Sequence, residues 1–398
     1  MKRVSLGIYI SVPFCRTKCS YCNFASDVFS KAVFEKYVDR VCSDIADATR
    51  VADSMGGRIE REVNSIYLGG GTPTVLDAGQ LRRMFDAVRA QFSVAHDAEI
   101  TVECAPGTLS LEVLETLQRC GVNRVSLGVQ SFVDREAATV GRLHKRASVL
   151  DDISRLRAAG ISVINIDLIA GLPHQTPESW RMSLTEAIAT GVPHVSVYML
   201  EVDGDSRLGR ELIAGGTRYH AHFVPNEEIV ADFYGTACET LEAAGIAQYE
   251  ISNFARPEFE SRHNLKYWMR QPYLGFGVDA HSMLASATPQ LEAIRFSTPD
   301  SLEKYVAGAP QQKTEVSRTA AMEEVFFLGL RLNRGVNLVQ VAENFGEQAV
   351  ERVRPTIAEL NGLGLLQHDG DLVRLTARGR LLSNEVFQSF IVQAEASA

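Results

Sequence analysis

The sequence predicts an α/β fold that is built on a sheet of parallel strands and is followed by a mainly helical, winged-helix-like module. In residues 1–200, short apolar segments alternate with longer segments whose apolar residues recur at helical spacing. The short segments are apolar along nearly their whole length, as strands are when both faces of a parallel sheet are buried. The last hundred residues lose this alternation and show three helical patterns and a hairpin pattern instead.

The predicted strands and helices follow one another in a regular order up to residue 200. The first strand covers residues 8–14, and the next strands cover residues 65–70, 99–105, 124–129, 163–169 and 194–200. The predicted helices cover residues 31–55, 79–92, 110–119, 146–159 and 177–190. Because the carboxyl ends of parallel strands meet at one edge of a sheet, we expect functional side chains to gather there.

Beyond residue 200 the pattern is less regular. Residues 203–217 are rich in glycine and charge and predict a loop, residues 226–244 predict an amphipathic helix, and residues 248–252 predict a further strand. The C-terminal module is predicted to hold helices over residues 317–332, 337–345 and 347–360, a hairpin over 365–376 that turns at Asp369-Gly370, and a closing helix over 377–390. We expect residues 393–398 to be frayed.

Composition and charge limit the classes of function. The chain has 398 residues, of which 45% are hydrophobic and 22% are charged, as in ordinary soluble globular proteins. It has no run of about 18 apolar residues, so we expect no membrane span, and no signal peptide is recognisable, so we expect a cytoplasmic location. The formal charge of -9 argues against a protein that wraps nucleic acid. The positive charge of Arg374, Arg378 and Arg380 keeps DNA binding by the C-terminal module as an alternative, but we favour a lid or docking role.

Three cysteines near the N-terminus, Cys15, Cys19 and Cys22, have the spacing C-x3-C-x2-C. Each can present a thiolate to one compact inorganic centre. Structural zinc usually takes its ligands from two separate pairs, and no second pair follows here. An iron-sulfur cubane normally takes four thiolates, so three would leave one iron open to another ligand. We favour the cluster, with buried structural thiols or a disulfide as the alternative.

One segment resembles the opening of the radical S-adenosylmethionine (SAM) superfamily: Tyr9-x-Ser11-x-Pro13-Phe14-Cys15-x3-Cys19-x2-Cys22-x-Phe24. More narrowly, it resembles the branch that contains the oxygen-independent coproporphyrinogen III oxidases and the HemW-type heme chaperones. The resemblance implies a partial (β/α) barrel of the radical SAM type, in which the three thiolates hold a [4Fe-4S] cluster and SAM occupies the open iron through its amino and carboxylate groups. Together with the helical and hairpin patterns of the last hundred residues, it predicts a core barrel over residues 1–240, a barrel extension over 241–300 and a C-terminal helical, winged-helix-like domain over 301–398.

Further candidate residues lie where predicted strands end. The run Gly69-Gly70-Gly71-Thr72-Pro73 follows a strand directly, so its backbone can approach a ligand closely and leave N–H groups free for an anionic group, or it forms a plain tight turn. A carboxylate at a buried strand end, such as that of Glu103, needs a partner, either a ligand ammonium or a basic side chain. The resemblance implies that SAM is contacted by Tyr9, Gly70, Gly71, Thr72, Glu103, Gln130, Arg142 and Asp167. Related enzymes of the branch hold a second SAM with such groups.

A second informative segment is His263-Asn264-Leu265-Lys266-Tyr267-Trp268, which places a candidate axial ligand next to flat aromatic rings. This combination suits a porphyrin, although the spacing alone favours an ordinary histidine among core aromatic residues. The resemblance reverses that preference, because HNxxYW is the segment associated with heme binding in the heme chaperones. It implies His263 as the heme ligand, with Arg262 as a partner for a propionate. His281 in the glycine-rich segment 273–282 is a secondary candidate ligand or proton donor.

The resemblance leaves two functions. One is a heme chaperone that binds the cluster, SAM and heme and transfers heme to an acceptor protein. The other is a radical SAM enzyme that acts on a porphyrinogen, by oxidative decarboxylation of coproporphyrinogen III or a related methyl transfer. The sequence leaves open whether SAM is consumed. The chaperone is favoured because Phe24 stands where the oxidases typically carry a further cysteine, and because the oxidases lack HNxxYW.

The chain departs from the pattern of the branch at two positions. Ser11 stands where histidine is common, and Asp279 stands where glycine is usual. The partners that the resemblance implies are heme, a heme-acceptor protein and an electron donor to the cluster. Peripheral contact with an acceptor in a membrane is compatible with this set, and we expect no nucleic acid partner.

Overall fold

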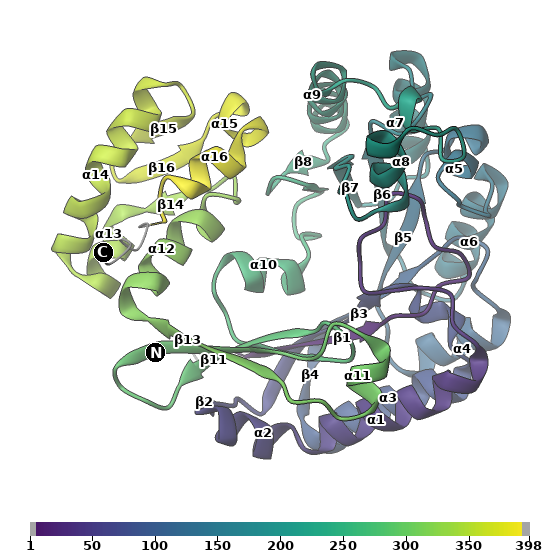
Figure 1. Cartoon of the computed structure of the whole chain (residues 1–398), viewed down its shortest axis with the longest axis horizontal. Coiled ribbons are helices and arrows are strands. Elements are labelled where there is room, and N and C mark those ends of the chain that lie inside the picture. Colours follow the sequence, from purple (N-terminus) through teal and green to yellow (C-terminus); the bar gives the residue numbers. More distant parts are fainter. Residues whose placement is uncertain (1–4, 392–398) are drawn as a thin grey trace.

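The computed structural model describes residues 5–391 and confirms the predicted α/β fold (Figure 1). Seven neighbouring strands of one large sheet run parallel in the order β10-β1-β3-β4-β5-β6-β7. Their bounds are β1 (Leu6–Val12), β3 (Glu62–Gly70), β4 (Ser93–Cys104), β5 (Arg124–Gln130), β6 (Val163–Ala170), β7 (His194–Met199) and β10 (Tyr273–Phe276). Within the described part of the chain the two ends of this sheet do not pair with each other, so the strands form an open, partial barrel.

The helices that connect these strands lie along the outer side of the curved sheet (Figure 1). They are α1 (Phe34–Ala46), α2 (Ala48–Met55), α3 (Ala78–Gln91), α4 (Leu111–Arg119), α5 (Asp134–Thr139), α6 (Arg146–Ala158), α7 (Pro177–Ala189) and α9 (Glu227–Ala243). Outward-facing strand residues such as Ile8, Ile10, Ile66 and Leu68 are fully buried in the main hydrophobic core. Burial of this apolar face against the helices is the main force that holds the barrel together.

The inner face of the sheet is polar. Tyr67 alternates with the buried Ile66 and Leu68, so its side chain points into the barrel, because successive strand residues face opposite sides. The same alternation places Glu103 and Asp167 on this face, where their carboxylates are hydrogen-bonded. Figure 1 shows the short helix α10 (Arg262–Trp268) on this inner side as well. The barrel therefore encloses a lining of polar side chains.

The structure contradicts the loop predicted over residues 203–217. Residues Arg207–Ala214 form helix α8, and Ser206 caps it by accepting a hydrogen bond from the Gly209 backbone. Three of the glycines that suggested a loop, Gly204, Gly215 and Gly216, lie outside this helix, and within it Leu208, Gly209 and Glu211 are buried. A short helix with one buried side gives too weak a periodic signal to be recognised from sequence.

Other predicted elements are interrupted. The first predicted helix breaks at Asp47 between α1 and α2, and the closing helix breaks at Leu382 between α15 (Ala377–Leu381) and α16 (Ser383–Gln388). The strand predicted over 248–252 is wrong, because β8 (Ala247–Gln248) and β9 (Asn253–Ala255) lie on either side of a bend. The predicted frayed tail at residues 393–398 lies outside the described residues.

Three antiparallel strands that the sequence did not suggest extend the large sheet beyond β10. They are β11 (His281–Ser286), β12 (Leu291–Ser297) and β13 (Gln312–Ser317), and β2 (Gly57–Arg58) pairs with β11. The domain limits that we expect at residues 240 and 300 stay predictions. None of the helices between residues 5 and 391 has the length and hydrophobicity that crossing a bilayer requires.

The C-terminal module is helical, as predicted, and has its own core. It contains α12 (Arg318–Gly329), α13 (Leu338–Phe345), α14 (Glu347–Gly362) and the hairpin of β15 (Leu366–Asp369) and β16 (Leu372–Leu375), which β14 (Val336–Asn337) extends. Phe326, Ile357 and Phe387 are among the buried residues of this second core. Arg378 and Arg380 donate hydrogen bonds to backbone carbonyls of the module itself.

Candidate functional site

The three predicted cluster ligands lie in the loop that follows β1. The loop closes on itself, because the Cys15 backbone donates to the Asp27 carbonyl at 3.0 Å and the Asp27 backbone donates to the Pro13 carbonyl at 2.9 Å. Cys19 is buried, Cys15 and Cys22 are half-buried, and all three are free thiols. The local fold therefore presents three thiols from one closed loop at the carboxyl end of a barrel strand.

Helix α8 holds this thiol loop in place. The Arg207 guanidinium donates to the Lys18 carbonyl at 3.3 Å, and the Leu208 backbone donates to the Ser20 carbonyl at 2.8 Å. The Asn23 amide donates to the Asp203 carboxylate, just before the helix, at 2.9 Å. These residues were not predicted as site residues, because the helix itself was not recognised in the sequence.

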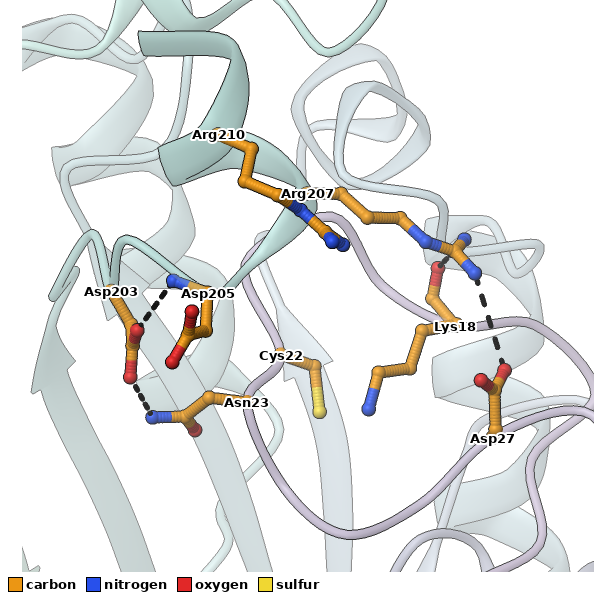
Figure 2. A pocket seen from close by; sticks show the side chains of 8 residues that line it. All are labelled: Lys18, Cys22, Asn23, Asp27, Asp203, Asp205, Arg207 and Arg210. Carbon is orange, nitrogen blue, oxygen red and sulfur yellow. Dashed lines mark hydrogen bonds and ion pairs between the residues drawn. The ribbon is translucent and has the colours of Figure 1, made fainter. Parts of the chain in front are cut away.

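A charged pocket of about 300 Å³ lies between the thiol loop and α8. Figure 2 shows the Cys22 thiol and the Lys18 ammonium pointing into it, with Arg207 and Arg210 of α8 above and Asp27 at one side. Arg207 also lies 4.0 Å from the Asp27 carboxylate. Asp203 and Asp205 also line the pocket, which gives solvent a path to the third thiol.

The glycine run after β3 packs directly against the thiol loop. The Gly71 backbone donates to the Val12 carbonyl and the Thr72 backbone to the Phe14 carbonyl, both at 2.8 Å. A Cβ on Gly71 would lie 2.8 Å from each of those oxygens and 3.0 Å from the Cys15 sulfur. The expectation that these N–H groups are left free is wrong, because the Gly70 N–H also has a protein acceptor, the Glu103 carboxylate. Only glycine at position 71 lets the two segments come this close.

Two half-buried carboxyl groups, those of Glu103 and Asp167, lie near the glycine run on the inner face. Glu103 accepts hydrogen bonds from the Tyr67 hydroxyl at 2.9 Å and from the Gly70 backbone at 3.1 Å. Burial, with the Asp167 carboxylate nearby, raises the pKa of Glu103 to about 7. Burial also raises the pKa of Asp167, which accepts hydrogen bonds from Ser126 and Asn165. A bound cation would favour the charged form of both groups.

Arg142 and Gln130 lie at the end of β5, close to the thiols. A Cβ on Gly128 would lie 3.1 Å from the Gln130 amide and 3.3 Å from the Arg142 guanidinium. The ends of both side chains therefore lie over Gly128 of this strand. Arg142 donates to the Tyr21 hydroxyl at 3.2 Å, and its buried Nε has no hydrogen-bond partner within the described residues. The neighbouring Tyr21 and Cys19 raise the pKa of Arg142 despite its burial. An anionic ligand would satisfy this buried donor.

This donor set fits a [4Fe-4S] cluster with SAM beside it. Three free thiols come from one loop, the Arg142 guanidinium lies next to them, and the half-buried carboxyl groups of Glu103 and Asp167 lie near Arg142. Between residues 5 and 391, no three His, Cys, Asp or Glu side chains converge closely enough to bind one metal ion. A [4Fe-4S] cluster does not require such convergence, because each thiolate binds a different iron.

The structure places the predicted heme ligand inside the barrel, away from the thiol loop. His263 is only 1% exposed. Its Nδ1 lies 3.0 Å from the Ser65 hydroxyl and its Nε2 lies 2.8 Å from the Tyr267 hydroxyl, so both ring nitrogens are occupied. Burial lowers the pKa of His263 to about 3, so the ring is neutral. Iron can bind this imidazole only after one of these hydroxyl groups has moved away.

Helix α10, which contains the HNxxYW segment, is held inside the barrel by contacts with residues outside the segment. Glu99 of β4 accepts hydrogen bonds from the first backbone N–H groups of the helix, and the Lys266 ammonium donates to the Ser5 carbonyl at 2.6 Å. Trp268 packs against the Arg331 guanidinium, which is 4.4 Å from the ring centroid and also lies over Phe387 of α16. The segment thus connects the barrel to the C-terminal module.

The other two predicted porphyrin contacts, Arg262 and His281, each lie next to an aspartate. Arg262 is paired with Asp97 at 3.3 Å. His281 is exposed and lies 3.8 Å from Asp279. Asp279 has a φ of 54°, in the left-handed region where glycine is least strained and aspartate is tolerated. The backbone at this position therefore suits the glycine that is usual in the branch.

The predicted SAM contact Tyr9 and the departure from the family pattern at Ser11 both lie on β1, next to the glycine run that follows β3. Tyr9 is half-buried on β1, with its hydroxyl near Ser11, and burial and Glu103 raise its pKa. The buried Ser11 faces the glycine run, since a Cβ on Gly70 would lie 2.9 Å from its hydroxyl. A small side chain at position 11 thus fits beside the glycine run.

Some inward-facing residues of the site were missed in the sequence. Tyr67, Ser126 and Asn165 bind the two carboxylates or line a cavity of about 20 Å³ beside Asp167, room for about one water molecule. Their signal in the sequence is the polar residue at every second position of β3, β5 and β6, which the continuous apolar pattern of the other positions obscured.

Comparisons with known proteins agree with this geometry. The family model of the radical SAM superfamily matches residues 9–187, and that of the HemN C-terminal domain matches residues 316–382. The heme chaperone HemW of Bacillus subtilis (strain 168) is 34% identical over 386 residues, which cover 96% of this chain and 98% of the relative. HemW of Escherichia coli (strain K12) is 30% identical over 395 residues, covering 99% and 100%. The solved structure of the radical SAM enzyme coproporphyrinogen III oxidase (HemN) from Escherichia coli has the same fold, with a TM-score of 0.81 at 24% identity, covering 97% of this chain and 90% of the other.

Proposed function

Because the chain belongs to the HemW family of heme chaperones within the radical SAM superfamily, we propose that it binds a [4Fe-4S] cluster, SAM and heme and transfers heme to an acceptor protein. One observation carries the proposal at the level of residues. The three thiols of the closed loop lie beside the glycine run, Arg142 and the carboxyl groups of Glu103 and Asp167, at one edge of the barrel. The proposal includes an electron donor to the cluster.

Each group has a role that its chemistry supports. Cys15, Cys19 and Cys22 would hold three irons of the cluster. The buried Arg142 guanidinium would bind the SAM carboxylate, with Gln130 beside it, and the carboxylates of Glu103 and Asp167 would attract the positive end of SAM. Gly70, Gly71 and Thr72 would provide the close backbone approach, next to Tyr9. When bound, a reduced cluster can donate an electron to SAM.

SAM affinity is expected to depend on the ionisation of Glu103. Below pH 7 the carboxyl is protonated and does not attract the permanently positive sulfonium, and above pH 7 it is charged. The affinity of reconstituted protein for SAM should therefore rise about tenfold between pH 6 and pH 8. Isothermal titration calorimetry under anaerobic conditions measures this change.

Two variants isolate the contribution of Glu103 to this pH dependence. Glu103→Gln should lose the rise, whereas Glu112→Gln, at an exposed acid on the outer helix α4, should keep it. The ammonium of SAM itself titrates equally in all three proteins, so their difference reports only on the side chain. An unchanged rise in Glu103→Gln would show that this carboxylate does not face the ligand.

The proposal includes heme binding by His263, which requires that one of its two ring nitrogens first loses its hydrogen-bond partner. The imidazole can reach iron only when Tyr267 or Ser65 releases a ring nitrogen, which requires α10 to shift inside the barrel. A shift of α10 carries Tyr267 along with His263, so the hydrogen bond that such a shift breaks is the one to Ser65 of β3.

The function is tested by offering both candidate ligands to the same anaerobically reconstituted protein. With hemin, we expect a saturable Soret band, at about one heme per chain, which survives desalting and decays when an apoprotein with higher heme affinity is added. With coproporphyrinogen III, SAM and a reductant, we expect no release of carbon dioxide. Decarboxylation without specific hemin binding would contradict the chaperone proposal and establish the porphyrinogen enzyme instead.

A further inference from the structure

A chain of hydrogen bonds runs inside the barrel from one of the predicted SAM contacts to the helix that carries the predicted heme ligand. It begins at the Asp167 carboxylate of β6 and ends at Ser261, the N-cap residue of α10. The residues between these two ends are Asn165 and His194, which are buried, and Tyr249, which is half-buried. None of the roles proposed above uses His194 or Tyr249.

Every link of this chain is at hydrogen-bond distance. The Asn165 amide donates to the Asp167 carboxylate at 2.7 Å, and Nδ1 of His194 lies 2.6 Å from the Asn165 side-chain oxygen. Nε2 of His194 lies 3.0 Å from the Tyr249 hydroxyl, which accepts a hydrogen bond from the Ser261 backbone at 3.2 Å. The chain therefore connects β6 to α10 through the start of β7 and the bend between β8 and β9.

The hydrogens of this chain all point toward the carboxylate. Asn165 turns its amide nitrogen to the Asp167 carboxylate, which accepts, so the amide oxygen faces His194 and accepts from Nδ1. Burial lowers the pKa of His194, so the ring is neutral and its Nε2 accepts from the Tyr249 hydroxyl. The Ser261 N–H supplies the donor at the far end. Each member of the chain thus fixes the orientation of the next, as far as the carboxylate.

The two ends of the chain also meet in the small cavity beside Asp167. Its lining includes Asn264, the second residue of the HNxxYW segment, together with Ser261 and Thr101. The Thr101 hydroxyl is buried and has no hydrogen-bond partner among the residues that the structure describes. A water molecule, for which the cavity has room, would bind such a group. The heme segment therefore forms part of the immediate surroundings of Asp167.

The position of α10 decides whether this chain is complete. The helix shift that separates His263 from Ser65, so that the imidazole can reach iron, also moves Ser261, because this residue caps the same helix. Tyr249 then loses its donor, and the cavity at the other end of the chain opens. A hydrogen-bonded network that has lost one member orients the others less firmly. We therefore expect Asp167 to attract a cation less strongly once α10 has moved.

From these contacts we infer that SAM and heme weaken each other's binding, because His194 and Tyr249 position Asp167 for SAM only while α10 stays in its enclosed position. The inference rests on the proposed function and concerns the regulation of the same two sites. Equilibrium linkage makes the effect reciprocal, so SAM lowers the affinity for heme by the factor by which heme lowers the affinity for SAM. Binding of SAM would thus favour the release of heme to an acceptor.

The test is a hemin titration of the full-length, anaerobically reconstituted protein, followed through the Soret band with and without saturating SAM. In the wild type we expect SAM to raise the Kd for hemin by about fivefold or more. Tyr249→Phe removes one hydroxyl and keeps the ring, so SAM should change its Kd for hemin by less than about twofold. Its affinity for SAM alone should already equal that of the heme-loaded wild type. Tyr305→Phe is the matched control and should keep the full effect, because its hydroxyl is also buried but bonds to Asp44, outside the chain.

The possible results separate this inference from the proposed function. A SAM effect of unchanged size in Tyr249→Phe would overturn the inference, because the two ligands would then compete directly for space. Calorimetric titration of heme-free and heme-loaded wild type with SAM measures the reciprocal effect without any variant. Equal SAM affinity in these two forms would also overturn the inference and leave the chaperone proposal intact. A wild-type protein without any saturable Soret band would instead refute the proposed function on which the inference rests.

Discussion

Replacing any one of Cys15, Cys19 and Cys22 with alanine is expected to abolish the brown chromophore of the anaerobically reconstituted protein. The three thiols come from one closed loop, and no other cysteine of the described residues lies in it, so a lost ligand has no replacement. Iron and sulfide content, with the absorbance spectrum, measure the effect. We expect less than a tenth of the wild-type cluster in each variant.

Cys42→Ala provides the matched control for these three variants. Cys42 is half-buried on helix α1, on the outer side of the barrel, and burial raises the pKa of its thiol, so the group stays protonated. This variant should retain the full cluster. A full cluster in any one of the three loop variants would remove that thiol from the ligand set.

Gly71→Ala is expected to have the second largest effect. Its Cβ would lie 2.8 Å from the Val12 and Phe14 carbonyl oxygens and 3.0 Å from the Cys15 sulfur, and the two carbonyls are backbone atoms that cannot simply rotate away. The thiol loop must move to make room. We expect the free energy of unfolding to fall by about 1–3 kcal/mol, and the iron content after reconstitution to fall below half.

Gly235→Ala should have the opposite effect on stability. Gly235 lies inside α9, where an added Cβ meets no atom within 4 Å, so the substitution should raise the free energy of unfolding by about 0.5–1 kcal/mol. Urea denaturation of both variants measures the two changes. Equal stability and full cluster content in Gly71→Ala would show that the thiol loop does not depend on close contact with the glycine run.

Features that depend on neighbouring residues in the chain were predictable from the sequence. The thiol spacing and the glycine run are local patterns, and the alternation of strands and helices follows from which side chains must be buried against the outer helices. These patterns were sufficient for the parallel α/β fold and for the helical C-terminal module. They also placed Glu103 and Gln130 correctly at the ends of strands.

Features that depend on distant contacts were not predictable in this way. Helix α8 is held by hydrogen bonds to the thiol loop, such as that from Leu208 to Ser20, which join segments nearly 190 residues apart. The two partners of His263 include Ser65, which lies 198 residues earlier in the chain. A motif in the sequence could suggest that His263 binds heme, but only the packing of α10 inside the barrel reveals that both nitrogens are occupied.

The most direct test of the account is the electron paramagnetic resonance spectrum of the reduced, reconstituted wild-type protein with and without SAM. We propose that Cys15, Cys19 and Cys22 hold three irons of a [4Fe-4S] cluster and leave the fourth to SAM. Binding of SAM to that iron would change its ligand field, so we expect a [4Fe-4S]⁺ signal whose g values shift when SAM is added. An identical spectrum in the presence of saturating SAM, or no reducible cluster at all, would contradict it.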